Sequence, residues 1–478
     1  MKSEASTRAQ EEFGRAKLGD VRNERRLLDM VVRVANRSSG KVSEVFDKPA
    51  ELQGAYDFLE NERVRAADIA MAIASKTAER CREHSYVFMP EDGSSITLTD
   101  RLKSKELGPI GASTAKARGL KMINCIAISP DGVPLGLLAQ KWWVRDDTPI
   151  GKKKTHAKRK TEQKETQHWL DAEQYARDIF AAAQIKTRIW TQKDREADSW
   201  PQILDALTHE TTQWTTIRAS WNRRLETGNT QEESVYLWPH IDKQEAAGCY
   251  KLDVQEGKNR RARVAHMQVR FCKVTLDLCD KRTDKRVPAE IYVVCTEEIG
   301  TTPQGEEPIR WRLLTTYPVL SLLDASLVID GYAKRWLVEQ FHKGWKSGQC
   351  NVEDTQLRSA EAIMKWATIL AADAMRLQRI VYFARTQPQA PASVELSLDE
   401  IQAATVLQYD SKKPRKHIDP ATVTISQAVE WIARLGGYTG RSSGGPPGMI
   451  VIARGLRDIA VAVRTIIQMR TMTAVPGV

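Results

Sequence analysis

The spacing of apolar residues changes along this chain, and the change restricts its fold more than any other feature. Up to about residue 84, apolar residues recur with the period of helices. From Tyr86 onward, short apolar runs separated by turn residues such as those at 130–132 are typical of a β-meander. Strand-like sequence returns at about 214–316, and helical sequence follows it. The pattern predicts a mixed α/β fold with helical regions at both ends.

Length and charge restrict the function. At roughly 150 residues per domain, a chain of 478 residues is expected to form about three units. Lys and Arg number 72 against 61 Asp and Glu, and the net charge of +11 favours a polyanionic partner. No apolar run reaches the roughly 18 residues that a membrane span needs, and the first twenty residues lack the apolar segment of a secretory signal. Seven cysteines without a C-x-x-C pair indicate reduced thiols in a cytosolic protein.

The first long helix is expected to end near residues 38–40 and to carry a basic face. At 100° per residue its four arginines fall within about 60° of one another, with apolar residues opposite. The arginines are Arg22, Arg26, Arg33 and Arg37, and the apolar set is Leu27, Leu28, Val31, Val34 and Ala35. Such a face can bind a polyanion or can be an ordinary solvated surface, and one helix alone does not distinguish the two.

The most informative helical segment runs from Tyr332 to Lys346. With Tyr332 as zero, Arg335 lies at about −60° around the helix axis. Glu339 and Lys346 lie at about −20° and −40°, so a phenol, a guanidinium, a carboxylate and an ammonium share one face. A solvated stripe of ion pairs is one interpretation. A single acid among cations favours instead a metal-binding carboxylate beside phosphate-binding donors.

A metal ion needs further carboxylates, and two aspartates follow expected strands. Asp92 comes two residues after the apolar run at 87–90, and Asp194 follows the strand-like run at 187–191. Acids at the carboxyl ends of strands lie where α/β sheets place their sites. Because aspartate is common in turns, each is weak evidence alone. Together with Glu339, they predict a cluster of three carboxylates.

Three segments carry a specific resemblance. They are Glu91-Asp92-Gly93-Ser94-Ser95, Asp194-Arg195-Glu196-Ala197-Asp198, and Tyr332-x-x-Arg335-x-x-x-Glu339-x-x-x-x-x-x-Lys346. The sequence resembles the bacterial cut-and-paste DDE transposases of the insertion-sequence-four family, near the transposon-five branch. The third segment has the residue types and spacing of the family's Y-R-E-K signature. Further matches at 17–20, 54–59 and 432–437 extend the resemblance over nearly the whole chain.

The resemblance implies a ribonuclease-H-like catalytic core interrupted by a β-rich insertion. It divides the chain into a helical DNA-end-binding domain (1–70), the core (71–384, with the insertion at about 214–316) and a helical dimerisation domain (385–478). It makes Asp92, Asp194 and Glu339 the catalytic triad, which would hold two Mg²⁺ or Mn²⁺ ions for in-line displacement at phosphorus. Family members cut transposon ends through a hairpin intermediate and insert the element into target DNA.

The same resemblance implies further roles. Tyr332, Arg335 and Lys346 would bind phosphates near the scissile bond, and Trp311 would stack on a flipped base. Arg218 resembles a DNA-contacting position. The implied partners are double-stranded DNA, as transposon ends and as target, and a second copy of the chain in a synaptic complex. The implied location is the bacterial cytoplasm, in association with the nucleoid.

Two departures from the family pattern are present. Gly93 stands where relatives often carry a hydroxyl, and the segment at 448–451 lacks aromatic residues common in the family's last helix. Two other classes of function stay open. One is a catalytically silent DNA-binding regulator or inhibitor derived from a transposase, and the other is a metal-dependent DNA nuclease without strand transfer.

Overall fold

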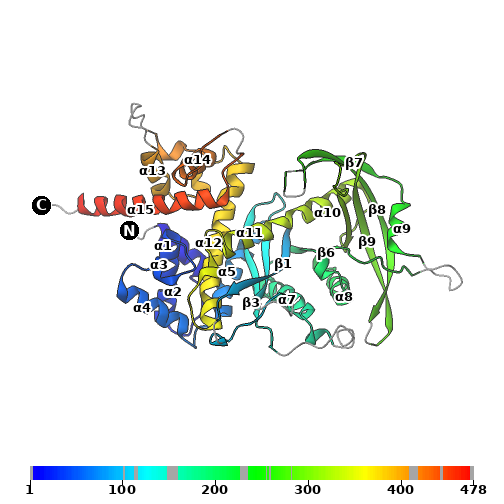
Figure 1. The fold of residues 1–478 in the computed structure, drawn as a ribbon, viewed down its shortest axis with the longest axis horizontal. Helices are drawn as coiled ribbons and strands as arrows, with labels where there is room; N and C mark the ends of the chain where they lie inside the picture. Colours follow the sequence, from blue (N-terminus) through cyan, green and yellow to red (C-terminus); the bar gives the residue numbers. More distant parts are fainter. Residues whose placement is uncertain are drawn as a thin grey trace.

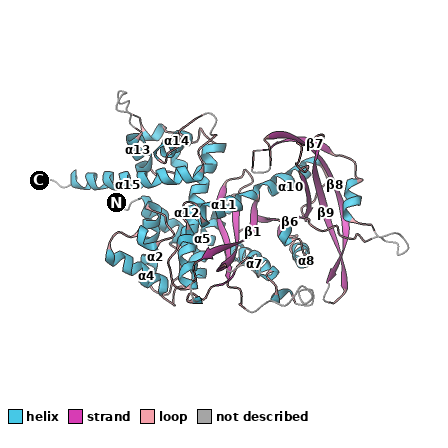
Figure 2. Ribbon diagram, in the orientation of Figure 1, coloured by secondary structure: helices cyan, strands magenta, loops and turns pink. Residues whose placement is uncertain are grey.

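The computed structural model describes residues 4–100, 103–111, 117–147, 160–226, 235–254, 256–257, 260–280, 283–408, 418–441 and 445–473. A single mixed sheet occupies the middle of this part of the chain (Figures 1 and 2). The helices of residues 4–81 and 398–473 lie at one end of the molecule, and the long strands of residues 248–299 lie at the other (Figure 1). The longest helix, α12 (Ala360–Thr386), runs between the terminal helices and the sheet.

The amino-terminal segment is helical, as its period predicts. Its helices are α1 (Glu4–Phe13), α2 (Val21–Asn36), α3 (Val42–Val45), α4 (Pro49–Glu60) and α5 (Ala66–Cys81). Helix α2 begins at Asp20, whose carboxylate accepts a hydrogen bond from the backbone N–H of Arg22. Its buried residues, Leu27, Met30 and Val34, follow an i, i+3, i+7 spacing. The prediction that Ala35 belongs to the core is wrong, because Ala35 lies outside this stripe and is exposed.

The centre of the sheet has mixed strand directions. Its strands are β1 (Tyr86–Leu98), β2 (Gly108–Pro109), β3 (Arg118–Ile128), β4 (Pro134–Trp143), β5 (Arg188–Lys193) and β6 (Gln213–Arg218). Strands β1, β5 and β6 are parallel neighbours, whereas β3 runs antiparallel between β1 and β4. Helices α7 (Thr166–Ala182) and α8 (Trp200–Thr208) supply the connections that parallel strands need. The mixed α/β fold is confirmed.

The strands that follow β6 extend the same sheet. They are β7 (Gly248–Val254), β8 (Arg263–Asp280), β9 (Lys285–Ile299) and β10 (Arg310–Thr315), preceded by α9 (Leu237–Asp242). Strand β10 pairs antiparallel with β6 on one side and with β9 on the other. The β-rich segment therefore continues the hydrogen-bond ladder of the centre (Figure 2). This pairing brings β10 next to the strand that carries Arg218.

Two helices return the chain across the sheet. The sequence predicts one helix over 321–347, but the structure has α10 (Leu322–Lys334) and α11 (Trp336–Lys346), which meet at Arg335. Arg335 keeps helical dihedral angles, with φ −54° and ψ −32°. Helix α10 lies close to β1, since a Cβ added to Gly331 would come within 2.4 Å of the Phe88 ring. This close contact fixes the start of α11 over the strand that carries Asp92.

The carboxyl-terminal segment is a small group of helices. They are α13 (Leu398–Leu407), α14 (Ile425–Leu435) and α15 (Met449–Thr473). A Cβ added to Gly455 would come within 1.7 Å of the Ile432 carbonyl oxygen, so α14 and α15 cross in backbone contact. Short 3-10 turns elsewhere are η2 (Thr161–Gln163), η3 (Arg195–Ala197), η4 (Val352–Asp354), η5 (Ala392–Val394) and η6 (Pro420–Thr422). Among the described helices, none is long and apolar enough to cross a membrane.

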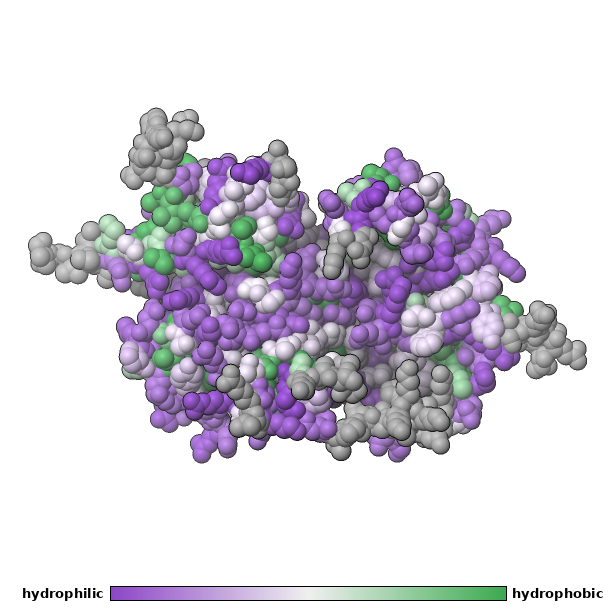
Figure 3. All heavy atoms as spheres, in the orientation of Figure 1, coloured by the Kyte–Doolittle hydropathy of each residue, from purple (hydrophilic) through white to green (hydrophobic). Residues whose placement is uncertain are grey.

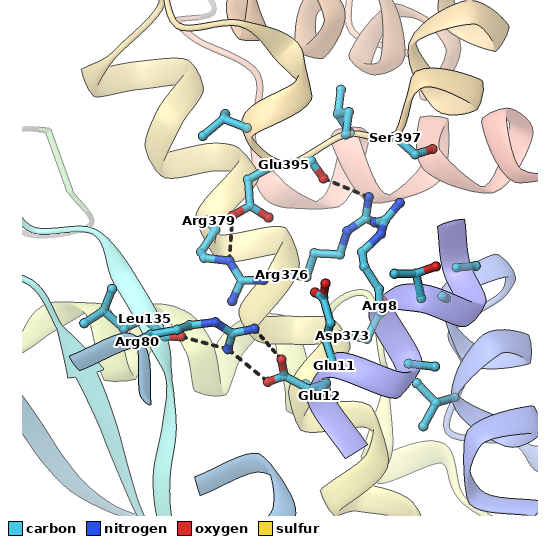
Figure 4. A pocket seen from close by; sticks show the side chains of 18 of the residues that line it. Arg8, Glu11, Glu12, Arg80, Leu135, Asp373, Arg376, Arg379, Glu395 and Ser397 are labelled. Atoms are coloured by element: carbon cyan, nitrogen blue, oxygen red, sulfur yellow. Dashed lines mark hydrogen bonds and ion pairs between the residues drawn. The ribbon is translucent and has the colours of Figure 1, made fainter. Parts of the chain in front are cut away.

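A cavity of about 910 Å³ lies where the amino-terminal and carboxyl-terminal helices meet α12 (Figure 4). Ion pairs tie its walls together. Arg8 of α1 lies 2.8 Å from Glu400 of α13, and Arg376 of α12 lies 2.9 Å from the same carboxylate. Arg379 likewise pairs with Glu395 at 2.7 Å (Figure 4). The charged side chains that line this cavity therefore hold the terminal helices against α12.

Candidate active site

Asp92 lies in the middle of a strand. The expectation that it follows a strand end is wrong, because β1 continues to Leu98 and pairs with β3 along its whole second half. Asp92 is the ladder partner of Asn124. Residues 93–95 are typical turn residues, but the long-range pairing with β3 keeps them extended.

Asp194 is at a strand end, as the sequence predicts. It directly follows β5 and caps η3, where its Oδ1 accepts a hydrogen bond from the backbone N–H of Glu196 at 2.8 Å. Strands β1 and β5 are parallel, and Pro90 is the register partner of Gln192. Asp92 and Asp194 are each two residues further along and therefore lie on the same face of neighbouring strands.

Glu339 is linked to Asp92 through Arg335. It lies in the first turn of α11, and its carboxylate forms an ion pair with the Arg335 guanidinium. The Nη1 of Arg335 lies 3.5 Å from Oδ1 of Asp92. The Arg335 guanidinium therefore lies between Glu339 and Asp92, and its charge also acts on Asp194, whose pKa it lowers. In the part of the chain that the structure describes, no three Asp, Glu, His or Cys side chains form a ready-made metal-binding group.

Burial and mutual repulsion disfavour the ionised forms of the carboxylates at this site. Burial raises the pKa of Asp194, and the nearby charge of Asp92 raises it further. Burial also raises the pKa of Glu196, and Asp194 and Asp92 add to that effect. A hard divalent cation binds carboxylate oxygens and would offset this repulsion, so the donor set fits Mg²⁺ or Mn²⁺. Glu196 was missed as a site residue, although its position two residues after Asp194 is a visible signal.

The predicted phosphate- and base-binding residues lie beside the acids. The Tyr332 ring is buried and makes an edge-to-face contact with Trp311 of β10, at 5.2 Å between centroids. The Arg335 guanidinium lies 6.0 Å from the centroid of the same ring. Arg218, at the end of β6, donates to the Arg310 carbonyl oxygen at 3.2 Å and interacts with the Tyr332 hydroxyl. The structure thus groups these four side chains.

Lys346 approaches the site from the far end of α11. Its Nζ lies 3.2 Å from the Ser94 hydroxyl, two residues after Asp92 on β1. The contact places an ammonium group along the strand that carries the first acid. His342 was not predicted as a site residue, yet its Nδ1 lies 3.4 Å from Oδ2 of Asp92. Its position three residues after Glu339 on the same helix is a signal that could have identified it.

The four arginines of α2 lie away from the acids, at the end of the molecule formed by the terminal helices (Figure 1). Arg22 pairs with Asp20 at 3.0 Å, Arg33 with Glu51 at 2.8 Å, and Arg37 with Asp47 at 3.6 Å, while Arg26 lies over Gly54 of α4. Arg22 and Arg37 are exposed, and the other two are half-buried. The four side chains therefore differ in how freely they could reach a ligand.

Comparison with known protein families places this geometry in a class. Family models described as Transposase DNA-binding, Transposase DDE domain and Transposase Tn5 dimerisation domain match residues 5–64, 144–372 and 372–475. The fold, the acids and these matches define a DDE transposase, an enzyme class whose catalytic domain implies divalent metal ions. The chain belongs to the Tn5-type transposases of the insertion-sequence-four family.

These matches confirm several expectations. The resemblance, the ribonuclease-H-like mixed fold with helical ends, and the enzyme class are confirmed. Among solved structures, the chain is similar to that described as "Cryo-EM structure of piggyBac transposase synaptic complex with hairpin DNA (SNHP)". The two share 8% sequence identity, with a TM-score of 0.32 over 78% of this chain and 73% of the other. That likeness is too distant to add to the assignment.

Proposed function

We propose that this chain is an active transposase that binds transposon ends, cleaves them through a hairpin intermediate and inserts the element into target DNA. The observation that carries the proposal is the arrangement of the three acids. Asp92 and Asp194 follow the same register on neighbouring strands and interact electrostatically, and Glu339 is joined to Asp92 through Arg335. Each chemical step is then the same substitution at phosphorus with a different nucleophile.

The three acids would hold two Mg²⁺ or Mn²⁺ ions, which when bound activate the attacking oxygen and stabilise the leaving oxygen. In the free chain Arg335 pairs with Glu339 and lies 3.5 Å from Asp92. A phosphate of bound DNA offers it another bidentate partner, and the acids are then free to bind cations. Tyr332 and Lys346 donate to neighbouring phosphates and fix the position of the scissile bond.

Trp311 is proposed as the platform for the base that is flipped when the hairpin forms. An extruded base loses its stacking in the duplex, and an indole can restore much of it. The edge-to-face contact with Tyr332 joins the Trp311 ring to the phosphate-binding residues. Arg218, which contacts the same tyrosine, is proposed to bind the backbone beside that base.

The terminal segments are proposed to bind the partners of this chain, which are transposon-end DNA and a second copy of the chain. The exposed guanidinium groups of Arg22 and Arg37 make α2 a candidate surface for transposon-end DNA, with Arg26 and Arg33 beside them. Exposed apolar side chains gather on α13 and α15, where Figure 3 shows a hydrophobic area at the end of the molecule. They include Leu398, Val406, Ile450 and Val461. These favour a homodimer in the synaptic complex, acting at nucleoid DNA in the bacterial cytoplasm.

The test is incubation of the purified chain with DNA that carries the native ends of the element and Mg²⁺. Nicks, hairpins and joined products are expected in that order. Glu339→Gln should keep end binding and remove all three products. Binding without any cleavage would indicate a silent regulator, and cleavage without joined products would indicate a nuclease. Either result would overturn the proposal.

A further inference from the structure

A row of polar side chains leads from the interior to Asp92. Asp92, Asn124 and Gln140 are ladder neighbours on the adjacent strands β1, β3 and β4. Gln140 Nε2 donates to Asn124 Oδ1 at 3.0 Å, and Asn124 Nδ2 lies 2.9 Å from Nε2 of His342. The other ring nitrogen of His342 faces Asp92. The amide of Asn124 is fully buried, and the imidazole is 7% exposed.

At the inner end of this row, the orientation of the Gln140 amide is fixed. The indole N–H of Trp142 lies 3.0 Å from Oε1 of Gln140, and an indole can only donate. The Thr368 hydroxyl, at 2.7 Å, can donate to the same oxygen. The Gln140 amide must therefore present its oxygen to Trp142 and its NH₂ group to Asn124. Reversing it would set two donors against each other in the interior, which is costly.

The orientation of the Gln140 amide determines the orientation of Asn124 and, through it, which ring nitrogen of His342 carries the proton. Because Gln140 donates to the Asn124 oxygen, the Asn124 amide must turn its NH₂ group toward His342. The Nε2 of His342 then accepts, and the ring proton is left on Nδ1. That nitrogen lies 3.4 Å from Oδ2 of Asp92, which is longer than an ordinary hydrogen bond. A small movement of either side chain would close the contact.

We infer that Trp142, through Gln140 and Asn124, fixes His342 as an Nδ1–H donor that orients the Asp92 carboxylate. The two oxygens of Asp92 are then distinct. Oδ2 is held by His342, and Oδ1, which faces Arg335 at 3.5 Å, is left for a metal ion. His342 is in this sense a positioning residue. The inference rests on the proposed role of Asp92 as a metal ligand, since hydrogen-bonded partners of metal ligands commonly set their orientation.

The tautomer is measured directly on the full chain labelled with ¹⁵N-histidine. Nitrogen chemical shifts distinguish a protonated from a bare ring nitrogen, and the His342 signals are those that disappear in His342→Gln. The expected result is a protonated Nδ1 and a bare Nε2. The opposite tautomer would overturn the inference. In Trp142→Phe, where the indole donor is lost, a mixture of tautomers is expected, and an unchanged single tautomer would remove Trp142 from the row.

Metal binding gives the second readout, by calorimetric titration with Mn²⁺. His342→Asn keeps an N–H near the position of Nδ1 and should bind within about threefold of the parent chain. His342→Gln keeps a donor only near Nε2 and should bind about 10- to 100-fold more weakly. The exposed His266 of β8 provides the control, and His266→Gln should leave binding unchanged.

Failure of the inference and failure of the proposed function give different results. If Asp92→Asn binds Mn²⁺ as tightly as the parent chain, Asp92 is not a ligand, and both fail. If Asp92→Asn loses binding while His342→Gln keeps it, only the positioning role fails. Thermal unfolding of each variant, followed by circular dichroism, separates a loss of binding from a loss of the fold.

Discussion

The ammonium of Lys193 lies 3.6 Å from Oε2 of Glu91, with both side chains buried in the sheet. Each residue directly precedes one of the two aspartates that are proposed to be catalytic. Because side chains alternate along a strand, this ion pair lies on the opposite face of the sheet from Asp92 and Asp194. It joins β1 to β5 beneath the acids and so helps to hold the register that places them side by side.

Loss of this ammonium should destabilise the protein. Lys193 also donates to the buried Glu173 and to Gln202, so Lys193→Met would leave Glu91 without its ion-pair partner and Glu173 with Arg177, at 3.8 Å, as its remaining counter-charge. We expect a loss of about 3–5 kcal/mol in the free energy of unfolding, measured by urea denaturation. Lys186→Met, at an exposed position before β5, should change it by less than about 0.5 kcal/mol. Equal effects of the two substitutions would contradict the structural role of Lys193.

Substitution of Arg335 should slow cleavage without weakening metal binding. Arg335→Gln removes a donor to the reacting phosphate, and single-turnover nicking should slow by about 100- to 1000-fold. Mn²⁺ binding should not weaken, because the guanidinium competes with cations for Asp92 and Glu339. Arg335→Lys keeps the charge without the planar fork and should be intermediate in nicking. A parallel loss of Mn²⁺ binding would show that Arg335 supports the acids rather than the DNA.

Substitution of Trp311 should slow hairpin formation and leave the first nick unchanged. If it stacks on a flipped base, Trp311→Ala should slow hairpin formation on a pre-nicked end by about 10- to 100-fold and leave the first nick unchanged. The matched control is Trp238 of α9, which packs on Arg312 at 4.5 Å, and Trp238→Phe should leave both steps unchanged. Slowing of the first nick by Trp311→Ala would indicate instead that the indole supports Tyr332 through their ring contact.

Features set by local sequence were predictable. Asp194 follows a short strand and opens a turn, and the spacing of Arg335 and Glu339 places them one helical turn apart, where they form an ion pair. Both depend on chain neighbours within a few residues. The family resemblance then supplied the expected roles of Trp311 and Arg218, which no local pattern indicates and which stay predictions.

Features set by long-range pairing were not predictable from the chain alone. In the sequence, Asp92 looks like a turn residue, because Gly and Ser residues follow it. The pairing of β1 with β3 shows that the strand continues past Asp92. The continuation of the sheet from β6 to β10 joins segments about a hundred residues apart. The approach of His342 to Asp92 depends on how α11 lies over the sheet, which the helical period does not specify.

The cavity between the terminal helices supplies a prediction about pH. Burial raises the pKa of Asp373 on α12 from an ordinary value of 3.8 to about 6, although Arg376 opposes the shift. Gln349 donates to its Oδ2 at 2.6 Å. Because the folded chain holds this proton more tightly than the unfolded chain, the stabilisation is complete below about pH 4. It is lost as the pH rises toward 6 and the folded state must bury a charge.

Asp373→Asn replaces this carboxyl with an amide that stays neutral at every pH. Its free energy of unfolding, measured by urea denaturation at intervals between pH 4 and 7, should therefore rise relative to that of the parent chain as the pH passes from 4 to 6. Above that range the difference should level off, because the carboxyl is ionised in both folded and unfolded states of the parent. A difference that stays constant across the whole range would show that Asp373 titrates alike in the two states, and that its burial at the junction of the terminal helices carries no electrostatic cost.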